Sequence, residues 1–446
     1  MKTVRRGIKI GSLGAAAVLG TTTAFAADKD LLDILLQNGS INQAQYDTLM
    51  EKETVTKADL DEVKVTLNHK GLQFKTADEN FEFALGGRLH AQAAYQDNDK
   101  IHFADGDIVD ADDGTEIRRG RIDMKGVFYK DFTFKTVVDF ADNDVAIKDM
   151  FLSYDGWDPV RFTVGSQKQH FSLEQWMSSN DMIFIERSLG HNSMEPDRAI
   201  GFVADTGGDN WTAALGAWGD SIDANKEDDE GWSAGGRVTY SPFNETGKVV
   251  HLGASGNYRV PEQNDQTARF RTETTRMSNL FLVDTDDIPD VDNIVFTGAE
   301  FAGVLGPFSV ESEYLRTFVQ RDAGGDLEFD SWYALAAWTL TGESRNYKGN
   351  KGKFGRLEPA RNFDLHGGWG AWELAARYSQ IDLNDGDING GRESAIAVAL
   401  NWYLNKNVRL MADYTRILQV DDGRFLTTGD DPEDMNILEL RAQWAF

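Results

Sequence analysis

The stretch FEFALGGRLHAQAAYQ, residues 81–96, carries the pattern that decides the fold. Apolar or small side chains occupy every second position from Phe81 to Tyr95, and Glu82, Arg88 and His90 stand among the residues between them. Successive side chains of a β-strand point to opposite faces, so this alternation predicts a strand with one apolar and one polar face. A tilted strand needs about ten residues to cross a bilayer, so this stretch is long enough to span a membrane.

About sixteen segments of this kind follow one another along the chain. They start near residues 81, 116, 132, 146, 160, 198, 211, 231, 249, 294, 307, 331, 371, 393, 408 and 436. Every backbone group must be paired inside the bilayer, so membrane-spanning strands must close into a barrel. A soluble β-sandwich or β-helix would also alternate, but the even count, the segment length and the terminal Phe446 favour the barrel. We therefore predict an all-β fold, a transmembrane antiparallel β-barrel of about 16 strands over residues 71–446.

The N-terminus predicts export. Four basic residues among the first nine precede an apolar run at residues 10–20, and Ala24-Phe25-Ala26 is a small-x-small cleavage site. Residues 1–26 are therefore expected to be a signal peptide; the Arg5-Arg6 pair also fits a twin-arginine signal, although two basic residues are usual in any such region. No later run approaches the ~20 apolar residues of a spanning helix. Export without a helical anchor, together with a barrel, predicts the outer membrane of a Gram-negative bacterium.

Residues 27–70 have a different period. Apolar residues at helical spacing lie between residues 31 and 36, Asn38-Gly39 interrupts them, and a second amphipathic stretch covers residues 41–50. A third is expected to begin near Thr56 and to run through Leu67. We interpret this region as a short helical periplasmic segment, with a self-associating coiled coil as the alternative.

The composition excludes several classes of protein. Cysteine is absent, which excludes a disulfide framework, a thiolate nucleophile and Cys-based metal sites. The net charge of −28 would become about −32 without the basic signal peptide, which argues against a nucleic-acid partner. The chain has only seven histidines and no His-Glu-x-x-His motif, so an enzyme is disfavoured.

Connection lengths predict the orientation of the barrel. If the helical segment is periplasmic, the first strand runs outward and the connections alternate between the two sides. The outside connections are then the long ones: 98–115, 168–197, 220–230, 260–293, 316–330, 382–391 and 419–435. Most inside connections are short, and the basic segment 342–361 is the exception.

Six spaced stretches resemble one family. They are Leu85-Gly86-Gly87-Arg88-Leu89; Arg118-Arg119-Gly120-Arg121; Leu173 to Leu189 with Ile185-Glu186-Arg187; Val249-Val250-His251-Leu252-Gly253; Thr339-Leu340-Thr341-Gly342-Glu343; and Gly370-Ala371-Trp372-Glu373-Leu374. With them, residues 71–446 resemble the phosphate-selective porin O/P family. The resemblance implies a sixteen-stranded homotrimeric barrel, narrowed by an inward-folded third loop and lined with arginine and lysine that pass small anions.

Candidate pore residues come from two sources. Strand parity alone places Arg88, Arg119, Arg121, Lys125 and Lys135 in the lumen, where guanidinium and ammonium groups can replace part of an anion's hydration shell. The resemblance implies pore-lining roles for Arg88, Arg118 and Arg119, a constriction role for Arg187, and an arginine ladder on the fifth loop with Arg269, Arg271 and Arg276. Where the family pattern has phosphate-binding lysines, this chain has Gln175 and Asn180, and Glu273 interrupts the ladder.

The acidic residues concentrate in the outside loops. They are Asp105, Asp107, Asp110, Asp112 and Asp113; Glu227 to Glu230; Asp284, Asp286, Asp287, Asp290 and Asp292; and Asp430, Asp431, Glu433 and Asp434. Charges more than a Debye length of ~8 Å from the constriction are largely screened there, so they are compatible with an anion pore. These clusters could instead bind Ca²⁺, alone or bridging lipopolysaccharide of the surrounding outer-membrane lipid, but no cofactor is required.

The sequence thus predicts passive diffusion of small anions, phosphate-like or other, through an Arg/Lys-lined pore. The alternatives are a general porin of low selectivity and a structural outer-membrane anchor without significant transport.

Overall fold

The computed structural model describes residues 29–50, 63–97, 100–102, 108–110, 113–220, 222, 230–262, 265–277, 280–421 and 435–446. The expected signal peptide and most of the acidic loop residues lie outside these ranges. The chain forms two units, residues 1–62 and 63–446. In the described residues no helix is long and apolar enough to cross a membrane.

The first unit contains the helix α1 (Lys29–Gln37) and a helical stretch at residues 43–50. A hydrogen bond of 2.6 Å from the Tyr46 hydroxyl to Asp33 Oδ1 joins the two. Both helices were predicted, but the third helix expected to run through Leu67 is wrong at its end. Val63–Asn68 is instead the strand β1, paired antiparallel with β2 (Gly71–Thr76). Three apolar residues at every second position in β1, Val63, Val65 and Leu67, also fit a strand, and pairing with β2 decides between the two.

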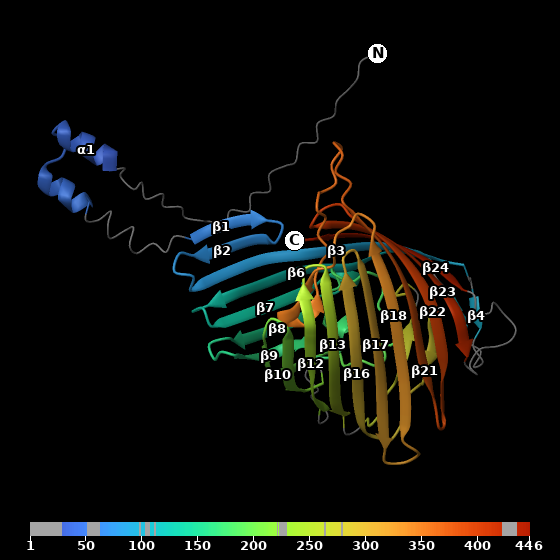
Figure 1. Cartoon of the computed structure of the whole chain (residues 1–446). Helices are drawn as coiled ribbons and strands as arrows, with labels where there is room; N and C mark the ends of the chain where they lie inside the picture. Colours follow the sequence, from blue (N-terminus) through green and yellow to red (C-terminus); the bar gives the residue numbers. More distant parts are fainter. Residues whose placement is uncertain are drawn as a thin grey trace. The chain divides into compact units, whose positions relative to one another are not determined.

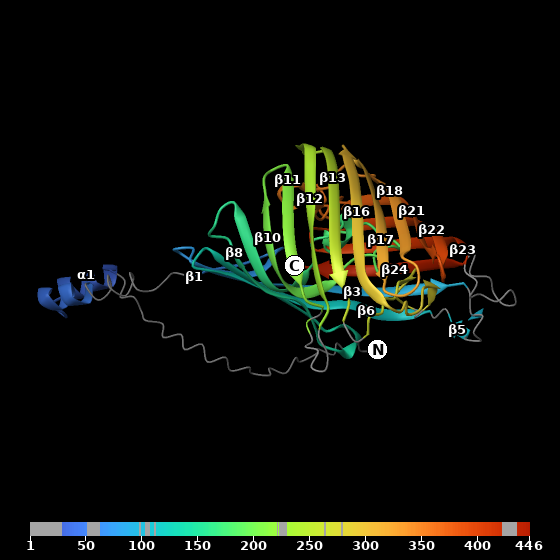
Figure 2. The same ribbon diagram turned by 90° about the horizontal axis from the view of Figure 1, so that it is seen from below.

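Sixteen strands of the second unit form one closed antiparallel barrel (Figures 1 and 2). In order they are β3 (Phe81–Gln96), β6 (Gly114–Phe128), β7 (Phe132–Asp139), β8 (Ala146–Tyr154), β9 (Val160–Lys168), β10 (Arg198–Gly207), β11 (Trp211–Trp218), β12 (Trp232–Glu245), β13 (Lys248–Val260), β16 (Val291–Leu305), β17 (Phe308–Arg321), β18 (Leu327–Thr339), β21 (Ala371–Asp385), β22 (Ile388–Tyr403), β23 (Val408–Asp421) and β24 (Asn436–Ala445). The predicted segments therefore correspond to the sixteen barrel strands.

Closure of the barrel takes place on β3. Strand β24 pairs with the half of β3 from Arg88 to Gln96, and the backbones of Phe446 and Gly87 exchange two hydrogen bonds of 3.0 Å. Strand β2 then takes the same edge of β3, between Glu82 and Leu85. The β1–β2 hairpin therefore continues the wall of the barrel past the point where the last strand ends (Figure 1).

The two faces of the wall differ as the alternation predicted. Large apolar side chains are exposed on the outside, for example Leu89 on β3, Leu440 on β24 and Trp332 and Trp338 on β18. Polar and charged side chains such as His90, Glu313 and Arg441 are buried on the inside. An apolar band facing lipid and a polar lumen are the arrangement of a membrane barrel.

Two outside connections are shorter than predicted. Strand β17 continues to Arg321 and β18 begins at Leu327, and only two residues separate β21 from β22. The predicted connections 316–330 and 382–391 are therefore wrong in length. Here the faces are reversed: the inward side chains are apolar and pack in a buried cluster with Phe270, Val283 and Ile288 of the connection 261–290. Apolar and polar residues still alternate in these strand ends, but the apolar ones face inward. The pattern therefore did not resemble that of a membrane-spanning strand with an apolar outer face.

Shorter elements lie in the connections. They are β4 (Lys100–His102), β5 (Ile108–Asp110), η1 (Ala141–Asn143), α3 (Leu173–Trp176), β14 (Arg271–Glu273), β15 (Phe281–Asp284), β19 (Tyr347–Lys348), η2 (Gly349–Lys351) and β20 (Lys353–Phe354).

Candidate functional site

The connection between β9 and β10, residues 169–197 and hereafter the third loop, lies against the inner wall of the barrel. Carboxylates of the wall accept its backbone N–H groups: Glu313 accepts from Leu173 at 2.7 Å and from Glu174 at 2.8 Å, and Asp413 accepts from Ile185 at 2.6 Å. A buried N–H without an acceptor is costly, so these carboxylates fix the course of the loop. The inward-folded third loop implied by the resemblance is therefore confirmed.

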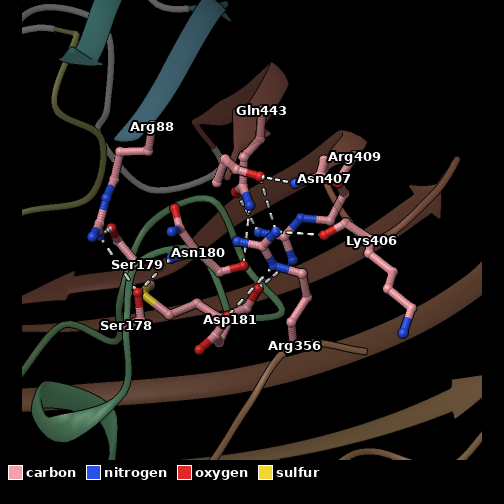
Figure 3. A network of polar contacts seen from close by, with 12 residues as sticks. Arg88, Ser178, Ser179, Asn180, Asp181, Arg356, Lys406, Asn407, Arg409 and Gln443 are labelled. Atoms are coloured by element: carbon pink, nitrogen blue, oxygen red, sulfur yellow. Dashed lines mark hydrogen bonds and ion pairs between the residues drawn. The ribbon is translucent and has the colours of Figure 1, made fainter. Parts of the chain in front are cut away.

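Side chains of the barrel wall donate hydrogen bonds to backbone carbonyl groups of the third loop. Their bonds are Gln443 to Asn180 at 3.1 Å, Arg409 to Met182 at 2.6 Å, Asn401 to Ile183 at 2.9 Å, Arg441 to Ile185 at 2.9 Å and Arg377 to Glu186 at 3.0 Å. Figure 3 shows part of this network, with Gln443 and Arg409 directed at the tip of the loop. The loop is therefore bound along residues 180–186 to strands β21 to β24.

A β-bulge brings two consecutive arginines into the lumen. On β3, His90 pairs with Arg119 and the next residue, Ala91, pairs with Ile117, so Arg118 is the extra residue. A bulge leaves one residue out of the ladder and re-aims its side chain. Arg118 lies 3.7 Å from Glu186 of the third loop, and Arg119 lies 3.5 Å from the ring of His90. Strict alternation could not place Arg118 inside, and only the resemblance implied it.

Most of the predicted lumen cations are paired with carboxylates. Arg88 contacts Asp123 at 2.6 Å and Arg121 contacts Asp139 at 2.6 Å. Lys135 shares Asp149 with Arg198, at 2.5 and 2.9 Å. Parity correctly placed these cations in the lumen, and each of these carboxylates cancels much of its partner's charge.

Four of the predicted cations make no ion pair with any described residue: Arg119, Arg187, Lys125 and, on the connection between β13 and β16, Arg271. Arg119 is 5% exposed, and its Nε has no hydrogen-bond partner. Arg187 donates from Nε to the Glu174 carbonyl at 3.2 Å. Arg119 and Arg187 therefore carry positive charge beside the third loop without a directly paired carboxylate.

The pKa values of Glu186 and Glu195, two acids of the third loop, are shifted in opposite directions. Burial alone would raise the pKa of Glu186, but Arg118, Arg441, Arg119 and Arg187 outweigh it and lower this pKa to about 2. Burial and the neighbouring Glu313 raise the pKa of Glu195 well above its ordinary value. Burial, with Arg187 and Lys168 nearby, lowers the pKa of His191 far below its ordinary value, and its Nδ1 contacts Glu195. At neutral pH, Glu186 is therefore charged and His191 is neutral, whereas burial disfavours the charged form of Glu195.

The connection 261–290, hereafter the fifth loop, carries the remaining predicted arginines. Arg269 and Arg271 are both exposed, and the residues beside them, Phe270 and Thr272, are buried, so the two guanidinium groups lie on one side of the segment. Arg269 pairs with Asp284 at 2.6 Å and Arg276 pairs with Glu273 at 3.0 Å. Arg271 lies over the ring of Phe281, 4.1 Å from its centroid.

The basic connection between β18 and β21 also reaches the third loop, which the sequence had not predicted. The Trp176 Nε1 donates to the Lys351 carbonyl at 3.1 Å, and Lys353 Nζ donates to the Trp176 carbonyl at 3.2 Å. Arg237, which pairs with Glu300 at 2.6 Å, donates to the Gly352 carbonyl at 2.9 Å. The unusual length and charge of this connection were the signal that could have indicated an inward position.

Lys168 and Arg198 are further cations that the sequence reading missed. Lys168 ends β9 and donates to the carbonyls of Gln175 and, at 3.1 Å, Met177. Lys168 lies within the predicted connection 168–197 and Arg198 directly after it, each at the end of a strand, and neither was assigned to a face.

Gln175 and Asn180, which stand where the family pattern has lysines, make hydrogen bonds within the protein. The Gln175 side chain donates to the Pro196 carbonyl, and Asn180 Oδ1 contacts His90 Nε2 at 2.9 Å. Asp181, beside Asn180, lies 3.7 Å from Arg356, and Arg88 reaches Ser178 and Ser179 at 3.5 and 3.4 Å (Figure 3). Neither replacement supplies a positive charge.

The acidic outside loops are only partly described. Within the described residues, no group of three or more histidine and carboxylate side chains could hold a metal ion. Asp284, Asp286 and Asp287 instead face Arg269. The other acidic clusters fall mainly outside the described residues.

A closed barrel with an apolar exterior, a charged lumen and a loop bound inside it defines an outer-membrane porin. The model of the family "phosphate-selective porin O and P" matches residues 83–446, and the chain belongs to this family.

Two curated relatives are similar over most of the chain. Porin O of Pseudomonas aeruginosa is 29% identical over 415 residues, 84% of this chain and 91% of the relative. An uncharacterised protein of Caulobacter vibrioides is 29% identical over 345 residues, 75% of this chain and 68% of the relative.

Solved structures agree on the fold. An anion-selective porin from Comamonas acidovorans has a TM-score of 0.52 at 14% identity, covering 82% of this chain and 100% of that one. The outer-membrane channel DcaP of Acinetobacter baumannii has a TM-score of 0.51 at 13% identity, covering 84% of this chain and 99% of that one.

Proposed function

We propose that this porin lets small anionic solutes diffuse passively across the outer membrane, with selection at the level of the third loop. The observation that carries the proposal is the surplus of cations there: Arg119 and Arg187 make no ion pair with a described residue, while Lys168 is held by carbonyl groups. A pore selects by the sign of its lumen charges, and uncompensated guanidinium groups favour anions. The family and the anion-selective relative in structure support the same class of solute.

Phosphate is not the solute that the site favours in particular. Phosphate dianions are best held by several charged donors, and the two loop positions with a lysine in the family pattern carry neutral Gln175 and Asn180. A general anion pore, with phosphate among several solutes, fits these residues. The low-selectivity porin remains the second candidate, because Arg88, Arg118 and Arg121 each face a carboxylate.

The proposal includes a homotrimer embedded in outer-membrane lipid and lipopolysaccharide, without catalysis. One structural relative, OmpT of Vibrio cholerae, was described in a trimer form, with a TM-score of 0.50. The apolar exterior of the barrel supplies surface for both lipid and a neighbouring copy.

The reversal potential of single channels in a KCl gradient tests the proposal. We expect an anion preference that falls when Arg119 or Arg187 is replaced by Ala. A cation preference in the unmodified protein would refute anion selection and leave the porin class standing. Added phosphate should not block the chloride current more strongly than other small anions.

A further inference from the structure

The partner of Arg119 differs from those of its neighbours. Arg88 on β3 and Arg121 on β6 each contact a carboxylate at 2.6 Å. The nearest polar group to the Arg119 guanidinium is instead the imidazole of His90, with Nη1 at 3.5 Å from Nδ1. Unlike Asp123 and Asp139, the partners of Arg88 and Arg121, His90 carries no negative charge.

The geometry fixes the protonation of this ring. Asn180 Oδ1 accepts hydrogen bonds only, so the contact of 2.9 Å requires the proton of His90 on Nε2. A guanidinium group only donates, so Nδ1 facing Arg119 must be an unprotonated acceptor. His90 is fully buried, and both ring nitrogens are used, one toward the wall and one toward the third loop. The ring is therefore neutral while both contacts hold.

The groups around the ring are cationic or neutral. Arg88 lies two residues away on β3, and Arg441 on β24 binds Gln92, the Ile185 carbonyl and Glu186. Gln443, which is opposite His90 on β24, donates to the Asn180 carbonyl at 3.1 Å (Figure 3). Glu186, which lowers the positive charge of this region, is shared between Arg441 and Arg118.

We infer that His90 is a specificity-determining positioning residue: it holds Arg119 and the third loop in place and leaves the Arg119 charge uncompensated. A carboxylate at this position would pair with Arg119 as Asp123 pairs with Arg88, and it would remove the surplus positive charge. A neutral amide would keep both contacts. The inference rests on the proposed anion selection at this level of the pore.

The test compares His90→Gln and His90→Glu in planar bilayers. His90→Gln should keep the ratio of chloride to potassium permeability within about two-fold of the unmodified channel. His90→Glu should lower this ratio by about five-fold at pH 7, by the field of one added charge at ~8 Å. Gln and Glu have nearly the same size and shape, so a purely structural role would not make the ratio depend on the charge of the new side chain.

The outcomes separate the two proposals. The ratio of the unmodified channel tests anion selection, whereas the difference between the Glu and Gln variants tests His90 whatever that ratio is. Equal ratios in the two variants would overturn the inference. A second measurement needs no added acid: Arg119→Gln should lower the ratio equally in the unmodified and the His90→Gln channels. No effect of Arg119→Gln would also overturn it.

Discussion

Replacing Glu186 by Gln removes one fixed negative charge from the third loop. Glu186 lies 3.1 Å from Arg441 and 3.7 Å from Arg118, and these arginines with Arg119 and Arg187 lower its pKa to about 2. It is therefore fully charged at pH 7, and its removal leaves a net positive charge. Arg441 keeps its bonds to Gln92 and to the Ile185 carbonyl, so the loop should stay in place.

The magnitude follows from Coulomb's law. An anion passing ~8 Å from the removed charge, at an effective dielectric constant of about 80, gains about 0.5 kcal/mol, and a cation loses as much. The difference of about 1 kcal/mol corresponds to an approximately five-fold rise in the ratio of anion to cation permeability. Reversal potentials in a KCl gradient measure this ratio directly.

Glu195→Gln is the matched control. Glu195 lies on the same loop, but burial and Glu313 raise its pKa well above its ordinary value, which disfavours its charged form. This substitution should leave the permeability ratio unchanged. The reasoning is refuted if Glu186→Gln fails to raise the ratio, or if Glu195→Gln raises it equally.

Three further predictions concern the supports of the site. Burial, partly opposed by Asp181, lowers the pKa of Lys353 to about 8. Lysine is charged below its pKa, so the anion preference should fall as the pH rises through about 8. Reversal potentials measured across this pH range should show the fall, and Lys353→Gln should abolish it. Asp413→Ala leaves the Ile185 N–H without its acceptor, at a cost of about 1–3 kcal/mol, and should produce noisier single-channel currents with higher conductance. Glu300→Ala leaves Arg237 buried without its counter-ion, at a cost of about 3–5 kcal/mol, and should lower the thermal unfolding midpoint, whereas an unchanged midpoint would contradict this role.

Part of the site could be read from the sequence. Alternation over residues 81–96 and 116–140 placed Arg88, Arg119, Arg121 and Lys135 in the lumen, because the strand period fixes the face of every side chain. It failed at Arg118, where a bulge interrupts the period and only the family resemblance implied the inward position. Periodicity also could not show which arginines are neutralised, since Asp139 and Asp149 reach their partners across neighbouring strands.

The sequence by itself determined the barrel. Its strands have a local period, and a membrane leaves closure as the only way to pair their backbones. Only the tertiary structure showed which segments fold into the barrel and which charges remain unpaired there. The third loop and the connection between β18 and β21 have no period, and their inward positions depend on single bonds to distant residues such as Glu313, Asp413 and Arg237. Likewise, the surplus charge at Arg119 depends on a neutral histidine on another strand, which no local pattern reveals.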